Sequence, residues 1–281
     1  AKANMAVGNI SGKVQGSLIE TIAAGALVNA AIGANSEADV DVGNIFGEVN
    51  GSYEGEIGAI GAVNAAIGSK SIAILDVGDT RGNVSGNEHL IVDAEGIVNA
   101  AIGSDTSAIA QVGNVTVYSE EASNHGVTLN ANAPLAVNAA IGSNSNAYFL
   151  VGNVDGTVDA PFSQYVTAAG AISAAIGSNT TSVISIGNMS GEVSGNYSNR
   201  ITGTASIAAA IGNNTDATIA IGNVGSKGTL NGSGHMTVTS ASSIAAAIGS
   251  NSVADISVGN IRESVGGTAN MDITTGVIMA A

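Results

Sequence analysis

Apolar and polar positions alternate with a period of two in a short segment that returns throughout the chain. Its first complete copy runs from Ala30-Ala31-Ile32-Gly33 to Val42-Gly43-Asn44. The apolar positions are Val40, Leu75, Ala110, Phe149, Ile184, Ile219 and Ile256, followed two residues later by Val42, Val77, Val112, Val151, Ile186, Ile221 and Val258, with mostly polar residues between them. Because side chains of a strand point alternately to two faces, this pattern predicts a β-strand with one buried face.

The segment repeats with a nearly constant period. The glycine of Ala-Ala-Ile-Gly falls at 33, 68, 103, 142, 177, 212 and 249, and the glycine of Val-Gly-Asn falls at 8, 43, 78, 113, 152, 187, 222 and 259. The second glycine always follows the first by ten positions, whereas the step from there to the next first glycine is 25 positions normally, 29 after Gly113 and 27 after Gly222. A fixed length indicates a segment held on both sides, and a variable length indicates surface loops.

A unit of about 35 residues with three or four short strands cannot bury its apolar face alone. Stacking such units one strand spacing apart buries the face and pairs the backbone groups. The sequence therefore predicts an all-β fold in which residues 1–281 form a single β-solenoid domain of about eight coils. Its strands should pair parallel and in register with those of the next coil.

Small or apolar residues occupy both faces of the strand that precedes the first glycine. We expect both faces to be covered, with alanines such as Ala31 letting a second sheet approach closely. At the other corner, asparagine follows the second glycine, and Asp79 is the exception. These amides are expected either to form a hydrogen-bonded ladder from coil to coil, as in cross-β stacks, or to serve their own turns. The ladder positions are Asn44, Asn114, Asn153, Asn188, Asn223 and Asn260, with Asn9 in the first coil.

The two ends of the chain carry complementary parts of the repeat and no evident cap. The segment from Gly276 to Ala281 matches the segment that begins at Gly25, and Ala1 enters just beyond the equivalent of Gly33. An uncapped strand edge can template further pairing, and a contact of this head-to-tail kind does not close on itself. We therefore expect the chain to polymerise through a joint formed by Ala1, Met5, Val7, Asn9, Ile278, Ala280 and Ala281.

Composition narrows the classes of partner. With 22 acidic and 7 basic residues the net charge is −15, which disfavours nucleic acid because phosphate binding requires clustered lysine and arginine. There is no cysteine, hence no disulfide or thiolate metal site. No apolar run reaches 18 residues, so no insertion into a membrane is expected. The chain begins at Ala1 without Met, as a secreted protein does after removal of its signal peptide, although a trimmed chain would look the same.

Candidate chemistry is sparse. Asp39, Asp41 and Asp76 lie on one strand face and could hold calcium, but a solvated acidic face is the simpler explanation. His89, His125 and His235 fall in the variable part of non-adjacent coils, so no metal site is assigned to them. We expect no cofactor, apart from that candidate calcium. Because no nucleophile motif and no cluster of acids and bases is present, we expect no enzyme activity.

The phrase Gly187-Asn188-Met189-Ser190-Gly191-Glu192-Val193-Ser194-Gly195-Asn196, set among alanine-rich strands, resembles the repeats of bacterial secreted functional-amyloid subunits, of the curlin-like and Fap-like kinds. The chain differs from curlin in repeat length and from Fap-like subunits in its contiguous repeats. The resemblance implies extracellular fibres of adhesion or biofilm matrix. The expected function is a structural subunit of such a filament. The alternative is a monomeric solenoid adhesin or ligand-binding module.

Overall fold

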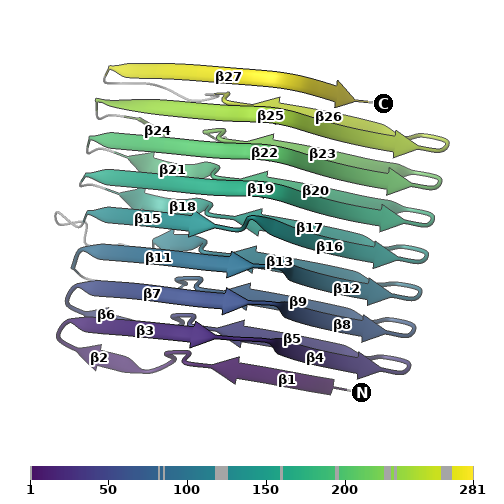
Figure 1. The fold of residues 1–281 in the computed structure, drawn as a ribbon, viewed down its shortest axis with the longest axis horizontal. Coiled ribbons are helices and arrows are strands. Elements are labelled where there is room, and N and C mark those ends of the chain that lie inside the picture. The colour runs from purple at the N-terminus through teal and green to yellow at the C-terminus, as the bar shows by residue number, and fades with distance from the viewer. Residues whose placement is uncertain are drawn as a thin grey trace.

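A computed structural model describes residues 2–81, 83–84, 86–117, 126–158, 161–193, 196–224, 229–230, 233–260 and 268–280. These residues form strands and turns without a helix, and the chain winds as a β-solenoid whose coils stack in one direction (Figure 1). Most residues inserted in the two longer repeats, among 118–125 and 225–232, lie outside the described part, as does His125.

We name the two strands joined by the turn at Gly33, and their equivalents in the other coils, an arc. The ten-residue segment forms the second strand of each arc, and these second strands make an eight-stranded sheet. Its members are β1 (Lys2–Val7), β5 (Glu37–Val42), β9 (Ile72–Val77), β13 (Ser107–Val112), β17 (Asn146–Val151), β20 (Thr180–Ile186), β23 (Thr215–Ile221) and β26 (Val253–Val258). Seven complete turns therefore separate β1 from β26.

A wide sheet of twelve strands forms the opposite layer. Its members are β3 (Leu18–Ala24), β4 (Leu27–Ile32), β7 (Tyr53–Ile60), β8 (Ala62–Ile67), β11 (Glu88–Glu95), β12 (Ile97–Ile102), β15 (Val127–Asn132), β16 (Leu135–Ile141), β19 (Phe162–Ile176), β22 (Tyr197–Ile211), β25 (Gly234–Ile248) and β27 (Ala269–Ala280). Early coils use two strands where later coils use one continuous strand (Figure 1).

Short strands complete each coil beside the eight-stranded sheet. One group contains β2 (Lys13–Gln15), β6 (Glu48–Asn50) and β10 (Asn83–Val84), and the other contains β14 (Val115–Val117), β18 (Val154–Val158), β21 (Met189–Val193) and β24 (Thr229–Leu230).

Every strand pair is parallel, and each residue faces its counterpart in the next coil. In the wide sheet, for example, Val28 pairs with Val63, which pairs with Val98. The predicted solenoid with parallel, in-register coils is therefore confirmed. Register is specified by the repeat itself, since a slip of one residue would move every inward side chain to the outside.

The main core lies between the two layers. Inward positions of the eight-stranded sheet, such as Val40 and Val42, are fully buried, as expected from the alternation. Near the tip of the arc the core narrows to alanine alone, where Ala31 and its equivalents pack against Ala38 and its equivalents. Small side chains let the two strands of the arc approach closely, which is why the chain needs few aromatic residues.

The sequence predicts that both faces of the strand before the first glycine are covered. This prediction is wrong, because a single chain covers only one of the two faces. Ala31 is buried, but its neighbours Val28 and Ile32 point the other way and are 66% and 69% exposed. The eight-stranded sheet covers only the inner face, so the outer face of β4 and its equivalents carries apolar side chains into solvent.

Candidate functional site

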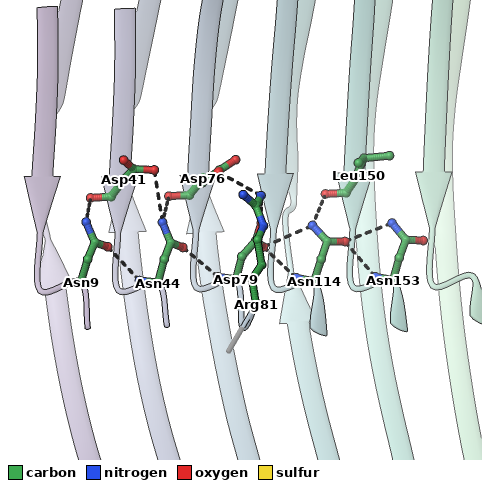
Figure 2. Close-up of polar contacts among 9 residues, drawn as sticks. All are labelled: Asn9, Asp41, Asn44, Asp76, Asp79, Arg81, Asn114, Leu150 and Asn153. Atoms are coloured by element: carbon green, nitrogen blue, oxygen red, sulfur yellow. Dashed lines mark hydrogen bonds and ion pairs between the residues drawn. The ribbon is translucent and has the colours of Figure 1, made fainter. Parts of the chain in front are cut away.

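The asparagines after the second glycine form a continuous chain of hydrogen bonds, which we name the corner ladder (Figure 2). It comprises Asn9, Asn44, Asp79, Asn114, Asn153, Asn188, Asn223 and Asn260. At each step the side-chain Oδ1 accepts the backbone N–H of the equivalent residue in the next coil, over 2.7–3.0 Å. Some of these amides also serve their own turn, since Asn188 Nδ2 contacts Ser185 Oγ at 2.7 Å. Both roles left open by the sequence are therefore present.

The corner ladder has a direction. Each coil offers an Oδ1 acceptor toward the C-terminal side and a backbone N–H toward the N-terminal side. At one end of the described stack Asn260 donates its N–H to Asn223 Oδ1 at 2.9 Å. At the other end Asn9 Oδ1 accepts from Asn44, and no coil of the described stack precedes Asn9. A second copy stacked beyond Asn260 would place the N–H of its own Asn9 against the Oδ1 of Asn260.

Asp79 is the one carboxyl in this column, and it is fully buried. Arg81 Nη2 lies 3.1 Å from Asp79 Oδ2 and 3.0 Å from Asp76 Oδ2, so one guanidinium serves two carboxyls (Figure 2). Burial raises the pKa of Asp79 to about 7, and the nearby Asp76 carboxylate adds to the rise, while the Asn114 N–H and Arg81 oppose it. Burial likewise raises the pKa of Asp76 to about 6.

Replacing Asp79 by asparagine is expected to stabilise the solenoid at alkaline pH. A raised folded-state pKa means that the folded chain binds the proton more tightly, so stability is highest in acid and is lost as pH rises through about 7. Asp79→Asn removes the buried charge and restores the ladder amide. We expect a gain of about 1–2 kcal/mol at pH 8, a smaller gain at pH 5 and almost none below about pH 4, measured by urea unfolding. Asp105→Asn, an exposed turn residue, is the matched control, and a loss of stability in Asp79→Asn at pH 8 would show that the Arg81 pair dominates.

A second ladder lies inside the arc and was not predicted from the sequence. Asn29 Nδ2 donates to Asn64 Oδ1, Asn64 to Asn99 and Asn99 to Asn138, each over 3.2 Å. The same amides reach across to carbonyls of the eight-stranded sheet, as Asn29 does to Asp39 O at 2.6 Å. This buried ladder ties the two layers together between the main core and the alanine core. Its signal in the sequence is the Asn of each Val-Asn-Ala-Ala-Ile-Gly.

A third row of polar side chains follows the tip of the arc. The residues there have left-handed backbone angles, with φ between 51° and 56°, which asparagine tolerates better than most residues. From Asp105 to Asn214 each side chain accepts from the amide of the next coil, at 2.7–3.1 Å. The row comprises Asn35, Lys70, Asp105, Asn144, Asn179, Asn214 and Asn251.

The candidate calcium ligands are brought near cations of the chain itself. Asp41 and Asp76 are partners in adjacent strands, as the sequence indicates, but Asp76 bonds Arg81. Asp39 lies 3.8 Å from Lys2 Nζ. Across the described residues no group of three or more histidine, aspartate or glutamate side chains is arranged to hold a metal. Calcium binding stays a prediction.

The predicted joint residues lie at the two ends of the stack. Met5 and Val7 are only half-buried, whereas the equivalent Val40 and Val42 in the next coil are fully buried. Ile278 is 43% exposed, on β27. Ala280 ends that strand, while Ala1 and Ala281 lie outside the described residues. In the described chain the core therefore reaches the surface at both ends.

Comparison of the chain with protein-family models, with curated proteins and with solved structures found no match. In the part of the chain that the structure describes there is no helix long and apolar enough to cross a membrane.

Proposed function

We propose that this protein is the structural subunit of an extracellular filament and that copies of it stack end to end. The observation that carries the proposal is the pair of complementary ends of the corner ladder, an Oδ1 acceptor at Asn260 and a backbone N–H at Asn9. The contact between two copies would repeat the contact that every coil already makes with the next.

Strand edges support the same arrangement. Gly43 N donates to Val7 O over 2.8 Å, so Val7 faces β5 and the backbone of the adjacent Ala6 faces away from it. At the other end Gly259 N donates to Ile221 O over 2.9 Å, so the backbone of Val258 faces away from β23. Edges of this kind are templates for pairing with another chain, and β1 of one copy would extend the sheet beyond β26 of another.

Side chains at these edges continue the core. In the register of the repeat, Met5 of one copy would stack on Ile256 of the other, and Val7 on Val258. All four residues are half-buried, and stacking would remove their remaining apolar surface from water. A head-to-tail contact does not close and therefore produces filaments rather than rings. The resulting fibre would serve adhesion, cell cohesion or biofilm matrix outside the cell.

Substituting Ala6 by proline is expected to stop filament growth and leave the chain folded. Proline removes an N–H that bonds nothing within the chain's own sheet, and proline is tolerated on edge strands. Its ring would block pairing with β26 of the next copy. Ala6→Ser keeps the N–H and is the matched control. Negative-stain imaging should show threads for the parent chain and for Ala6→Ser, and light scattering should show short species for Ala6→Pro.

Circular dichroism of Ala6→Pro should match that of the parent chain, which excludes simple misfolding. Threads of normal length from Ala6→Pro would refute the proposed joint. A parent chain that stays monomeric at every concentration would favour the alternative, a monomeric adhesin or ligand-binding module.

A further inference from the structure

The outer face of β4 and its equivalents is a flat surface made only of apolar side chains. It has three columns over seven coils, which we name the valine–alanine–isoleucine face. The columns are Val28, Val63, Val98, Val137, Ile172, Ile207 and Ile244; Ala30, Ala65, Ala100, Ala139, Ala174, Ala209 and Ala246; and Ile32, Ile67, Ile102, Ile141, Ile176, Ile211 and Ile248. Its isoleucine column is 38–69% exposed.

The rest of the same sheet shows that this composition is not general. Beyond Gly61 and its equivalents the outward positions are largely polar, with Glu54, Glu56, Asp93 and Glu95 among them. One layer thus carries a largely polar half, acidic at β7 and β11, beside an apolar half. Contiguous apolar patches of this size on a soluble protein mark an interaction surface.

We propose that the valine–alanine–isoleucine face binds the same face of a second copy of this chain, so that two solenoids pair side by side. The proposal concerns lateral pairing and does not depend on end-to-end stacking. Its geometry is that of a two-fold contact between identical patches.

The shape of the face favours an identical partner. The small alanine column lies as a groove between two ridges of larger residues. When two such faces meet with a shift of one column, a ridge of each copy enters the groove of the other, as in a steric zipper. A partner that fills this groove must also repeat at the coil spacing, because the ridges rise and fall once per coil. Another copy of the solenoid has that spacing by construction.

The distribution of charge over the chain also favours a second copy as the partner of this face. The chain carries a net charge of −15, so two copies repel each other over most of their surfaces. None of the 21 positions of this face is charged or polar, and it is therefore where repulsion between copies is least. The net negative charge and the acidic side chains of β7 and β11 would repel an anionic lipid surface, which argues against a membrane as the partner.

The area suits a weak contact that is repeated along a filament. Seven coils at about 4.8 Å and three alternate columns cover about 34 Å by about 17 Å, or about 600 Å² per copy. Because the shift of one column leaves about two-thirds of each face in contact, a pair of single chains would bury about 800 Å², the size of a weak interface. In a filament the same contact would add up with every subunit.

The test introduces charge into the groove. The first double variant combines Ala139→Glu and Ala174→Glu, two positions that are partners in adjacent coils. The control double variant combines Asn132→Glu and Thr167→Glu, which are also partners and lie on the same outer surface. Both double variants add the same charge at the same inter-coil spacing, but only the first lies in the apolar face. All are made in the Ala6→Pro chain, so that end-to-end growth does not obscure the result.

Sedimentation equilibrium of the Ala6→Pro chain should show a dimer. The Ala139→Glu, Ala174→Glu variant should dissociate at least about 100-fold more readily, because it would bury four uncompensated carboxylates in the pair. The Asn132→Glu, Thr167→Glu variant should stay dimeric. An uncharged variant, Ala139→Leu with Ala174→Leu, should also weaken the dimer by filling the groove.

Three results would overturn the proposal. One is an Ala6→Pro chain that remains monomeric at all concentrations, and another is equal dissociation of both glutamate variants. The third is a chain that never dimerises but binds phosphatidylcholine vesicles, and that loses this binding in the Ala139→Glu, Ala174→Glu variant. That result would assign the face to lipid. If Ala6→Pro still forms threads, the proposed end-to-end joint is misplaced. Lateral pairing is then measured from the width of the threads, which should fall from two solenoids to one in the Ala139→Glu, Ala174→Glu variant.

Discussion

Gly103→Ala is expected to lose more than about 4 kcal/mol of unfolding free energy. Gly103 has φ of +153°, and a Cβ built there would lie 1.2 Å from the carbonyl oxygen of Gly68 in the preceding coil. Neither backbone can move without opening the stack between β8 and β12. The equivalent glycines at 142, 177 and 212 have the same contact at 1.2 Å.

Two other glycines separate the sources of this cost. Gly33 has φ of +136° but no atom within 4 Å of the place that an added methyl group would take, so Gly33→Ala should lose only the backbone strain, about 1–3 kcal/mol. Gly25 lies outside the left-handed region and also has open space, so Gly25→Ala should change little or stabilise slightly. Urea unfolding in the Ala6→Pro chain would measure all three. Equal losses in Gly103→Ala and Gly33→Ala would contradict close backbone stacking as the reason for the glycine column.

The stacking could be predicted from the sequence because two independent regularities agree. Alternation around Val40 and Val42 identifies a strand and its buried face, and the constant spacing of ten positions from Gly33 to Gly43 identifies the segment held by its neighbours. Together they leave one arrangement, in which the apolar columns around Val40 and Val42 stack on their own repeats. The parallel register follows from that arrangement.

The exposed face of β4 could not be predicted, because the pattern says nothing about which chain provides the cover. Val28 and Ile32 are as apolar as any core position, and the sequence therefore indicates burial on both sides. Only the fold shows that the eight-stranded sheet reaches the Ala31 side and leaves the other side to solvent. Cover by a second copy would leave the same sequence signal as cover within the chain.

The buried ladder escapes sequence reasoning for a different reason. Asn29 and its equivalents look like interruptions among small residues, although a polar residue at a fixed place in an apolar strand needs a partner when it is buried. The partners are carbonyls of the facing strand, and these come close only because alanine at Ala31 and Ala38 brings the layers together. The polar contact and the small side chains therefore depend on each other, which local alternation cannot reveal.

That dependence makes Asn99→Ala the second large effect. Asn99 Nδ2 donates to Asn138 Oδ1 and Ala73 O, each at 3.2 Å, and to Ile109 O at 2.6 Å. Its Oδ1 accepts from Asn64 Nδ2 at 3.2 Å. Alanine leaves these buried groups without that partner, and we expect a loss of about 2–4 kcal/mol by urea unfolding in the Ala6→Pro chain.

Controls for Asn99→Ala come from the same chain. Asn130 points outward from β15, so Asn130→Ala should stay within about 0.5 kcal/mol of the parent. Asn99→Ser should recover part of the loss, because Ser173 occupies the same column two coils on and donates to Ala147 O at 3.3 Å. If Asn99→Ala costs no more than Asn130→Ala, the amide is not what joins the layers, and the alanine columns alone must hold the arc closed. A cost in the expected range, partly restored by serine, would instead make hydrogen bonding across the arc a condition for alanine packing at its tip.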